Sequence, residues 1–147
     1  MATIELMNLV KHYRQGAAIV RALDGVDLAI EAGEFAAVVG RSGSGKTTLL
    51  DLVGLLMRPT SGSIRIDGED TARLSDGRRA AIRGRRVGFI FQEYNLLPTL
   101  SVVDNVLLPL RYTGADLRDG RRRALQLLEM VGLGDRLGHR PDQLSGG

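Results

Sequence analysis

One segment of eight residues, Gly40-Arg41-Ser42-Gly43-Ser44-Gly45-Lys46-Thr47, constrains this chain more than any other feature. It matches the pattern G-x-x-x-x-G-K-[ST], in which glycines let the backbone curl so that successive N–H groups face a phosphate. An apolar run at residues 35–39 precedes it, and an apolar helical pattern at 46–56 follows it. The pattern requires a strand before the loop and a helix after it, so the sequence predicts a phosphate-binding loop at a helix start.

The motif assigns a role to each part of the loop. Lys46 is expected to reach the β- and γ-phosphates, Thr47 to ligate Mg²⁺ through its hydroxyl, and Thr48 to donate to an α-phosphate oxygen. A glycine-rich turn with a chance lysine is the alternative, which eight matched positions in the right context disfavour. The Asn-Lys-x-Asp pattern of guanine readers is absent from the sequence, which favours ATP. The predicted ATP-binding residues are Gly40, Arg41, Ser42, Gly43, Ser44, Gly45, Lys46, Thr47 and Thr48.

Composition excludes several other classes of protein. The 147 residues include no cysteine, so neither a disulfide framework nor a thiolate metal site is possible. No apolar run approaches the roughly 18 residues that a spanning helix needs, and the start of the chain lacks the pattern of a signal peptide. The net charge of +3 is too small to indicate nucleic-acid binding. A cytosolic location is the default expectation.

The pattern along the chain changes from strands to helices. Strand candidates lie at residues 4–9, 26–30, 35–39, 63–66 and 87–91, and helix candidates at 46–56, 102–110 and 116–131. The runs at 35–39 and 87–91 are continuously apolar, which is typical of strands buried on both faces of a parallel sheet. We therefore predict an α/β fold: a P-loop NTPase core with an N-terminal antiparallel β layer and a partial helical subdomain.

Five blocks of sequence, taken together, resemble the ATP-binding cassette (ABC) ATPases. Tyr13 lies where these proteins place an aromatic residue, and the phosphate-binding loop follows it. Pro59-Thr60-Ser61-Gly62 with Asp67-Gly68 is similar to their turn and hairpin, and Phe91-Gln92 to their Q-loop. Leu144-Ser145-Gly146-Gly147 is similar to the start of their signature. LSGG is a weak motif alone, but it is strong roughly a hundred residues after a phosphate-binding loop.

The resemblance implies further roles for these residues. Tyr13 would stack on adenine, Gln92 would position Mg²⁺ and the attacking water, and Lys46 would act in catalysis. The signature residues Leu144, Ser145, Gly146 and Gly147 would contact the ATP of a partner subunit. It also implies a homodimeric sandwich of ATP-binding subunits, a membrane permease subunit, and a peripheral location on the inner face of the cell membrane. Tyr13 as a surface aromatic and Gln92 as a polar residue ending a strand are the alternatives.

The residues around and after Phe91 indicate which branch of the family the sequence resembles. The stretch 89–100, followed by Asp104-Asn105-Val106, resembles the ATPases that power lipoprotein release and macrolide export. Asp104 stands where Glu is usual in that branch, and Asp51 and Met57 replace the usual Asn and Asp. The function that this implies is coupling of ATP binding and hydrolysis to transport, as export or lipoprotein release. Two alternatives remain: a non-transport ABC ATPase acting on DNA or the ribosome, and a regulatory module that binds nucleotide without hydrolysis.

Catalytic parts of the family pattern fall after the signature. They are an apolar strand ending in Asp-Glu and a downstream His, and the sequence stops at Gly147. We therefore expect a C-terminally truncated ABC nucleotide-binding domain, whose parent is an ATPase and which itself lacks turnover. Its expected parts are a β layer and P-loop core over about 1–92 and a helical subdomain over about 93–147. The arginine runs at 73–86 and 121–123 are expected to be solvated helix faces, and the alternative is a surface that meets an acidic partner, anionic lipid headgroups or nucleic acid.

Overall fold

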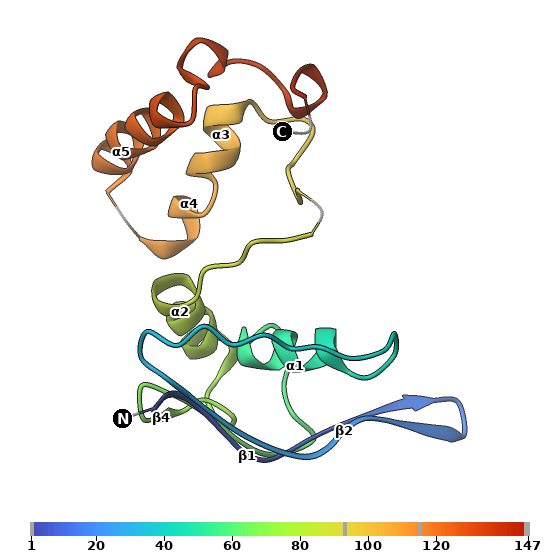
Figure 1. The fold of residues 1–147 in the computed structure, drawn as a ribbon. Helices are drawn as coiled ribbons and strands as arrows, with labels where there is room; N and C mark the ends of the chain where they lie inside the picture. Colours follow the sequence, from blue (N-terminus) through green and yellow to red (C-terminus); the bar gives the residue numbers. More distant parts are fainter. Residues whose placement is uncertain (1, 93, 115, 146–147) are drawn as a thin grey trace. The chain divides into compact units, whose positions relative to one another are not determined.

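The computed structural model describes residues 2–92, 94–114 and 116–145. They form two compact units, and the boundary along the chain lies between Val87 and Gly88. The first unit is built on an antiparallel sheet (Figure 1). The order of its strands is β2-β1-β3-β4. Its strands are β1 (Ala2–Gln15), β2 (Ala18–Glu31), β3 (Ser61–Ile66) and β4 (Glu69–Asp70). The strands expected near 4–9, 26–30 and 63–66 are confirmed as parts of β1, β2 and β3.

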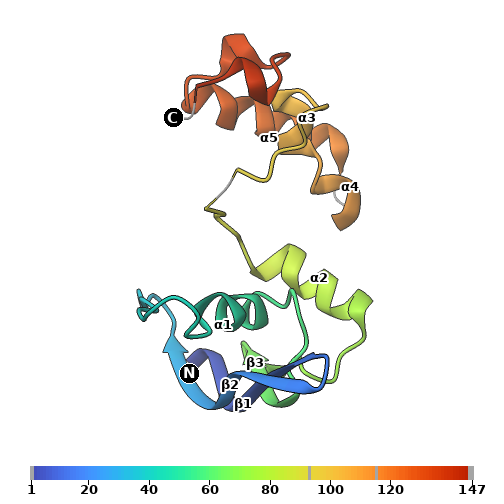
Figure 2. The same ribbon diagram turned by 90° about the vertical axis from the view of Figure 1, so that its right-hand side faces the viewer.

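Two helices cover one side of this sheet, α1 (Lys46–Val53) and α2 (Asp76–Arg86) (Figures 1 and 2). Alternating apolar residues of the strands meet the helices in one buried cluster. The cluster consists of Leu6, Leu9, Leu23, Leu52, Leu55, Ile64, Ile66 and Ile82. The sheet therefore supplies the floor on which α1, and with it the glycine-rich loop, is held.

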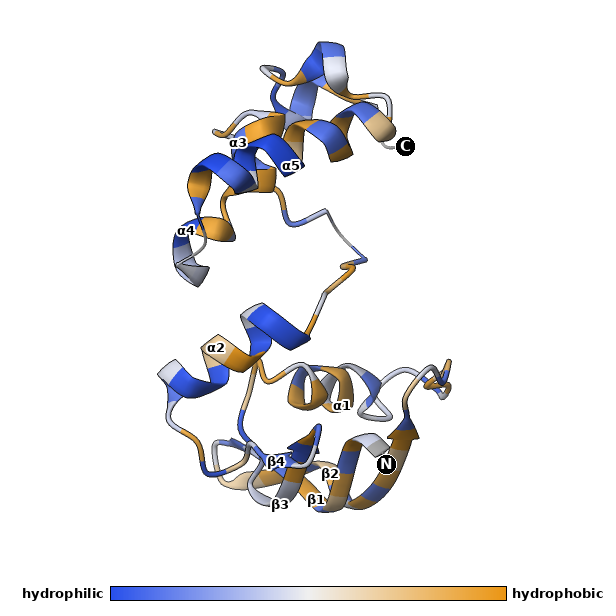
Figure 3. Cartoon of the chain, turned by 90° about the vertical axis from the view of Figure 1, so that its left-hand side faces the viewer, coloured by the Kyte–Doolittle hydropathy of each residue, from blue (hydrophilic) through white to orange (hydrophobic). Residues whose placement is uncertain are grey.

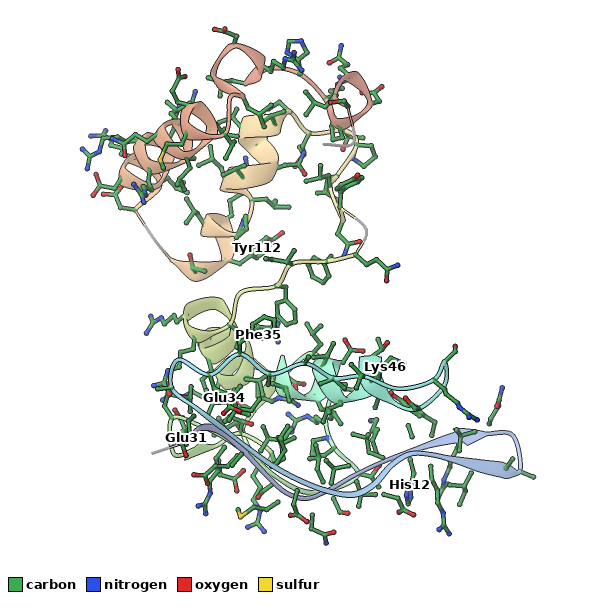
Figure 4. The ribbon with its side chains drawn as sticks, in the orientation of Figure 1. His12, Glu31, Glu34, Phe35, Lys46 and Tyr112 are labelled. Carbon is green, nitrogen blue, oxygen red and sulfur yellow. The ribbon has the colours of Figure 1, made fainter. Side chains whose placement is uncertain are left out.

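The expectation that residues 35–39 and 87–91 form buried strands is wrong for this structure. Neither segment belongs to a strand, and the Val39 and Ile90 side chains are almost fully exposed. Phe35 is exposed in the same way (Figure 4). A parallel strand needs neighbours that bond to both of its edges, and the described residues place no strand beside either segment. Apolar sequence alone therefore did not decide the structure of these segments.

Arginine side chains of α2 bind the segment that follows α1, at backbone carbonyl groups beyond the end of that helix. Arg83 donates to the Leu55 carbonyl at 3.0 Å, and Arg79 donates to the Met57 carbonyl. Arg79 is buried, and that burial lowers the pKa of its guanidinium. The prediction that this arginine run is a solvated face is thus wrong at Arg79. The run also forms α2, a helix that the apolar periodicity did not reveal (Figure 3).

The second unit is helical, as predicted. It comprises α3 (Val102–Leu107), α4 (Leu110–Thr113), α5 (Leu117–Met130) and two 3₁₀ turns, Gly134–Arg136 and Pro141–Gln143. Pro109 interrupts the single helix expected at 102–110, because proline is tolerated at a helix start and not inside one. Asp116 caps α5 through the Arg118 N–H, which confirms the predicted start. No described helix is long and apolar enough to cross a bilayer.

Candidate functional site

The glycine-rich loop leads directly into the first turn of α1. Gly43 and Gly45 have φ of 78° and 88°, a left-handed conformation that side chains other than glycine rarely adopt. The Ser44 N–H donates to the Arg41 carbonyl at 3.2 Å, which closes the turn. The Leu49 N–H is the first to bond along the helix, to the Gly45 carbonyl at 2.8 Å. The N–H groups of the first turn are therefore among those that a helix leaves unsatisfied.

The start of α1 differs from the starts of the other described helices of six or more residues. Ser75, Ser101 and Asp116 cap α2, α3 and α5 with side-chain oxygens, each of which accepts from a backbone N–H of the first turn. Gly45, at the same position of α1, offers no side-chain hydrogen bond. The positive end of the helix dipole adds to these N–H groups, so the loop and helix together favour an anion.

Lys46 extends back over the loop that precedes it (Figure 4). Its ammonium group donates to the carbonyl oxygens of Gly40 at 2.9 Å and Arg41 at 2.7 Å. These two contacts hold a positive charge against the loop backbone. The N–H groups at the start of α1 and a cation thus belong to one short segment, which is the arrangement that a phosphate chain requires.

Gly45 has a second reason to be glycine, which the motif did not reveal. A methyl group added there would meet the backbone carbonyl oxygen of Ala22 in β2, and would lie 3.1 Å from Cδ2 of Leu23. A methyl group on Gly43 would meet no described atom within 4 Å. The loop is therefore packed closely on the sheet at Gly45 and open at Gly43.

Comparison with known proteins identifies the family that carries this loop. The family described as ABC transporter matches residues 23–147. An ABC transporter ATP-binding protein of Thermotoga maritima is 51% identical over 144 residues, which is 98% of this chain and 62% of that protein. The chain belongs to the ABC transporter family. The macrolide export ATP-binding/permease protein MacB of Syntrophobacter fumaroxidans is 50% identical over 149 residues, which covers 100% of this chain and 21% of that protein.

A solved ABC cassette confirms the predicted fold class. The dimeric post-hydrolysis structure of the ATP-binding cassette MJ0796 with ADP and Pi is 41% identical, with a TM-score of 0.85 over 97% of this chain and 63% of that one. The chain thus spans less than two thirds of the length of these relatives. The predicted α/β class, with a P-loop core, an antiparallel β layer and part of the helical subdomain, is that of the ABC cassette.

Tyr13, the proposed ABC aromatic, lies near the hairpin end of β1, opposite Val20 of β2. Its hydroxyl donates to the Met57 sulfur at 3.2 Å, and 38% of its surface is exposed. The ammonium group of Lys11 lies 5.2 Å from the centre of its ring. The ring is thus fixed by its hydroxyl while part of its surface stays accessible, and its role with a base stays a prediction.

Gln92 and the signature belong to the second unit. Gln92 is exposed in the segment between α2 and α3. Leu144 packs on the buried cluster of Val102, Val103 and Leu128, and Ser145 follows it on the surface. Gly146 and Gly147 lie outside the described residues. The residues of the loop lie together in the first unit, whereas Gln92, Leu144 and Ser145 belong to the second. The roles of these three residues with nucleotide stay predictions.

Two residues of the second unit carry contacts that the sequence did not predict. The Asn105 side chain accepts from the Leu97 N–H at 2.8 Å and donates to the carbonyls of Leu97, Leu100 and Ser101. Asp104 accepts a hydrogen bond of 2.6 Å from the Ser101 hydroxyl, which itself caps α3. Aspartate at a position where the branch usually has glutamate therefore still supports the start of this helix.

The donors for a metal are few among the described residues. No group of three or more acidic or histidine side chains that could hold an ion is found there. Thr47, at the first turn of α1, offers a hydroxyl beside the loop. Mg²⁺ is usually held by one or two protein ligands together with phosphate oxygens and waters, so this donor set fits a magnesium ion that arrives with its nucleotide.

Proposed function

We propose that this chain is the nucleotide-binding part of an ABC transporter ATP-binding subunit, which couples the binding and hydrolysis of ATP to transport. The start of α1 carries the proposal, because its N–H groups have no side-chain cap and Lys46 lies against the same loop. The triphosphate of ATP would lie on residues 40–48, with its oxygens accepting from the N–H groups of the loop and first turn. Lys46 would turn from the Gly40 and Arg41 carbonyls toward the β- and γ-phosphates.

Magnesium would be held by the Thr47 hydroxyl and by the Gln92 side-chain oxygen, with phosphate oxygens completing the shell. It would neutralise charge on the β- and γ-phosphates. Gln92 would also orient the attacking water without adding charge, and Lys46 would stabilise charge on the transferred phosphoryl group. For a polypeptide limited to these 147 residues we expect no steady turnover, which phosphate release measures, because the described residues hold no acidic cluster for metal and water.

The partners and location follow from the relatives. Two solved MJ0796 cassettes are dimers, which supports a sandwich of two ATP-binding subunits in which residues 144–147 of one face the ATP of the other. The MacB relatives join an ATP-binding part to a permease, which supports a membrane partner here and a place on the cytoplasmic face of the membrane. We propose export as the direction of transport. The names of these transporter relatives favour this function over action on DNA or the ribosome.

Replacing Tyr13 by tryptophan tests the whole site, because the sequence contains no other tryptophan. We expect ATP to quench the indole fluorescence with an affinity close to that of the unchanged protein, since an aromatic face is preserved. Tyr13→Ala is expected to weaken ATP binding by about 5- to 150-fold, because stacking of a base on an aromatic ring contributes about 1–3 kcal/mol. Normal ATP binding by Tyr13→Ala would show that Tyr13 is a surface residue.

Replacing Thr47 by alanine distinguishes the contribution of the metal to ATP binding from that of the nucleotide alone. We expect the Mg²⁺-dependent gain in ATP affinity to fall several-fold, while binding in EDTA changes little, because the hydroxyl would ligate the metal and not the base. Thr113→Ala is a matched control, since that hydroxyl bonds to the Leu110 carbonyl at 3.2 Å within α4 of the second unit. Nucleotide titrations with and without Mg²⁺ measure the difference. Equal losses under both conditions would remove Thr47 from the metal site.

A further inference from the structure

The segment that leaves α1 is fastened along β1 by contacts far apart in sequence. The Thr60 N–H donates to the Val10 carbonyl at 2.8 Å, and the Thr60 hydroxyl accepts from the His12 N–H at 3.0 Å. The Met57 sulfur accepts from the Tyr13 hydroxyl at 3.2 Å. One end of α1 therefore carries the phosphate-binding loop, and the segment after its other end holds the proposed base-stacking ring.

Lys11 joins this segment to the same ring. Its ammonium group donates to the Arg58 carbonyl at 2.7 Å, and it lies 5.2 Å from the ring centre of Tyr13. That distance is within the range at which a cation is attracted to the face of an aromatic ring. Lys11 and Lys46 are the two lysines of the sequence, in which the other 18 basic residues are arginine. The ring is thus held at its hydroxyl by Met57 and at its face by Lys11.

We propose that Lys11 is a positioning residue for the base of the nucleotide. It clamps one face of the Tyr13 ring to the backbone of the segment after α1, so that the opposite face is presented to the base at a fixed position relative to the loop. This inference rests on the proposed function, because it requires that Tyr13 stacks on the base. Its chemistry is specific, since the clamp needs both a positive charge over the ring and a donor for the Arg58 carbonyl.

Removing the charge and the donor tests the clamp. In the full-length protein, Lys11→Met is expected to weaken ATP binding by about two- to fivefold, the contribution of an exposed cation on an aromatic ring. Binding of inorganic tripolyphosphate, which has no base, is expected to stay unchanged. Lys11→Arg should restore most of the ATP affinity. Arg14→Met removes a charge three residues along the same exposed end of β1, and is expected to leave both affinities unchanged.

A double variant shows whether Lys11 acts through Tyr13. In a Tyr13→Ala background, Lys11→Met is expected to have no further effect on ATP binding, because coupled residues do not contribute independently. An equal loss in both backgrounds, an equal loss of tripolyphosphate binding, or unchanged ATP binding by Lys11→Met would overturn the proposal. If the unchanged protein bound neither ATP nor tripolyphosphate, the proposed function itself would fail, and this inference with it.

Discussion

Replacing Lys46 by alanine is expected to lower the affinity for ATP by about 100-fold or more and to abolish hydrolysis by the full-length protein. The ammonium group is the cation that lies on the loop, at 2.9 and 2.7 Å from two of its carbonyls. Hydrogen bonds to charged groups contribute about 1.5–3 kcal/mol each, and two of them to phosphate oxygens account for a loss of this size. Titration with fluorescent ATP and phosphate release measure both effects.

Lys46→Arg is the informative companion to this variant. It keeps the positive charge, but the planar guanidinium is wider than an ammonium group and does not fit a contact designed for a compact charge. We expect it to bind ATP more tightly than Lys46→Ala and still to hydrolyse slowly. Circular dichroism should be unchanged in both variants, because the side chain bonds to the loop and not to the buried cluster. Unchanged ATP affinity in Lys46→Ala would exclude the proposed phosphate site.

Replacing Gly45 by alanine is expected to have the second largest effect, a loss of about 2–4 kcal/mol in the free energy of unfolding together with loss of ATP binding. The residue has a φ of 88°, and its added methyl group would meet the Ala22 carbonyl oxygen. The left-handed conformation costs a residue with a side chain about 1–2 kcal/mol, and the contact with backbone adds to this because β2 cannot move without its partners.

Two other glycines distinguish the cost of the left-handed backbone from the cost of the contact with β2. Gly43→Ala has a φ of 78° but meets no described atom within 4 Å, so we expect the conformational cost alone, about 1–2 kcal/mol. Gly77→Ala lies inside α2 and also meets no described atom within 4 Å, and it is expected to stabilise the protein by up to about 1 kcal/mol. Urea denaturation measures all three. Equal losses for Gly45→Ala and Gly43→Ala would mean that the packing on β2 contributes nothing.

The parts of this fold that the sequence predicted are those specified by nearby residues. The loop at 40–47 and the Asp116 cap depend on contacts within a few positions, and β1 and β2 are consecutive strands of one hairpin. The prediction of strands at 35–39 and 87–91 was wrong because a strand also needs partner strands from elsewhere in the chain. The run at 73–86 was expected to be a solvated helix face, and the burial of α2 was not predicted because its buried positions are Arg79 and Ile82, and arginine does not count as apolar in a periodicity pattern.

The candidate site also combines a part that is local in sequence with contacts that are distant in sequence. Its phosphate part is one continuous segment, and the motif alone predicts it. The hydrogen bond from Tyr13 to Met57 joins positions 44 residues apart, and that from Lys11 to Arg58 joins positions 47 apart, so no local sequence pattern predicts them. The close approach of Gly45 to Ala22 likewise depends on how β2 passes beneath α1. The sequence therefore predicts the phosphate-binding segment, while the contacts that hold the proposed base-stacking ring of Tyr13 are seen only in the tertiary structure.

Because α1 has no side-chain cap, we expect the stability of this helix to depend on how much nucleotide is present. A ligand that binds the folded protein alone adds about 2.7 kcal/mol to the free energy of unfolding when its concentration is a hundred times its dissociation constant. That added stability would slow hydrogen exchange most at the backbone amides of the first turn of α1, where Gly45 makes no side-chain cap hydrogen bond. We therefore expect amide hydrogen exchange at residues 46–49 to slow when ATP is abundant and to speed up when ATP is scarce.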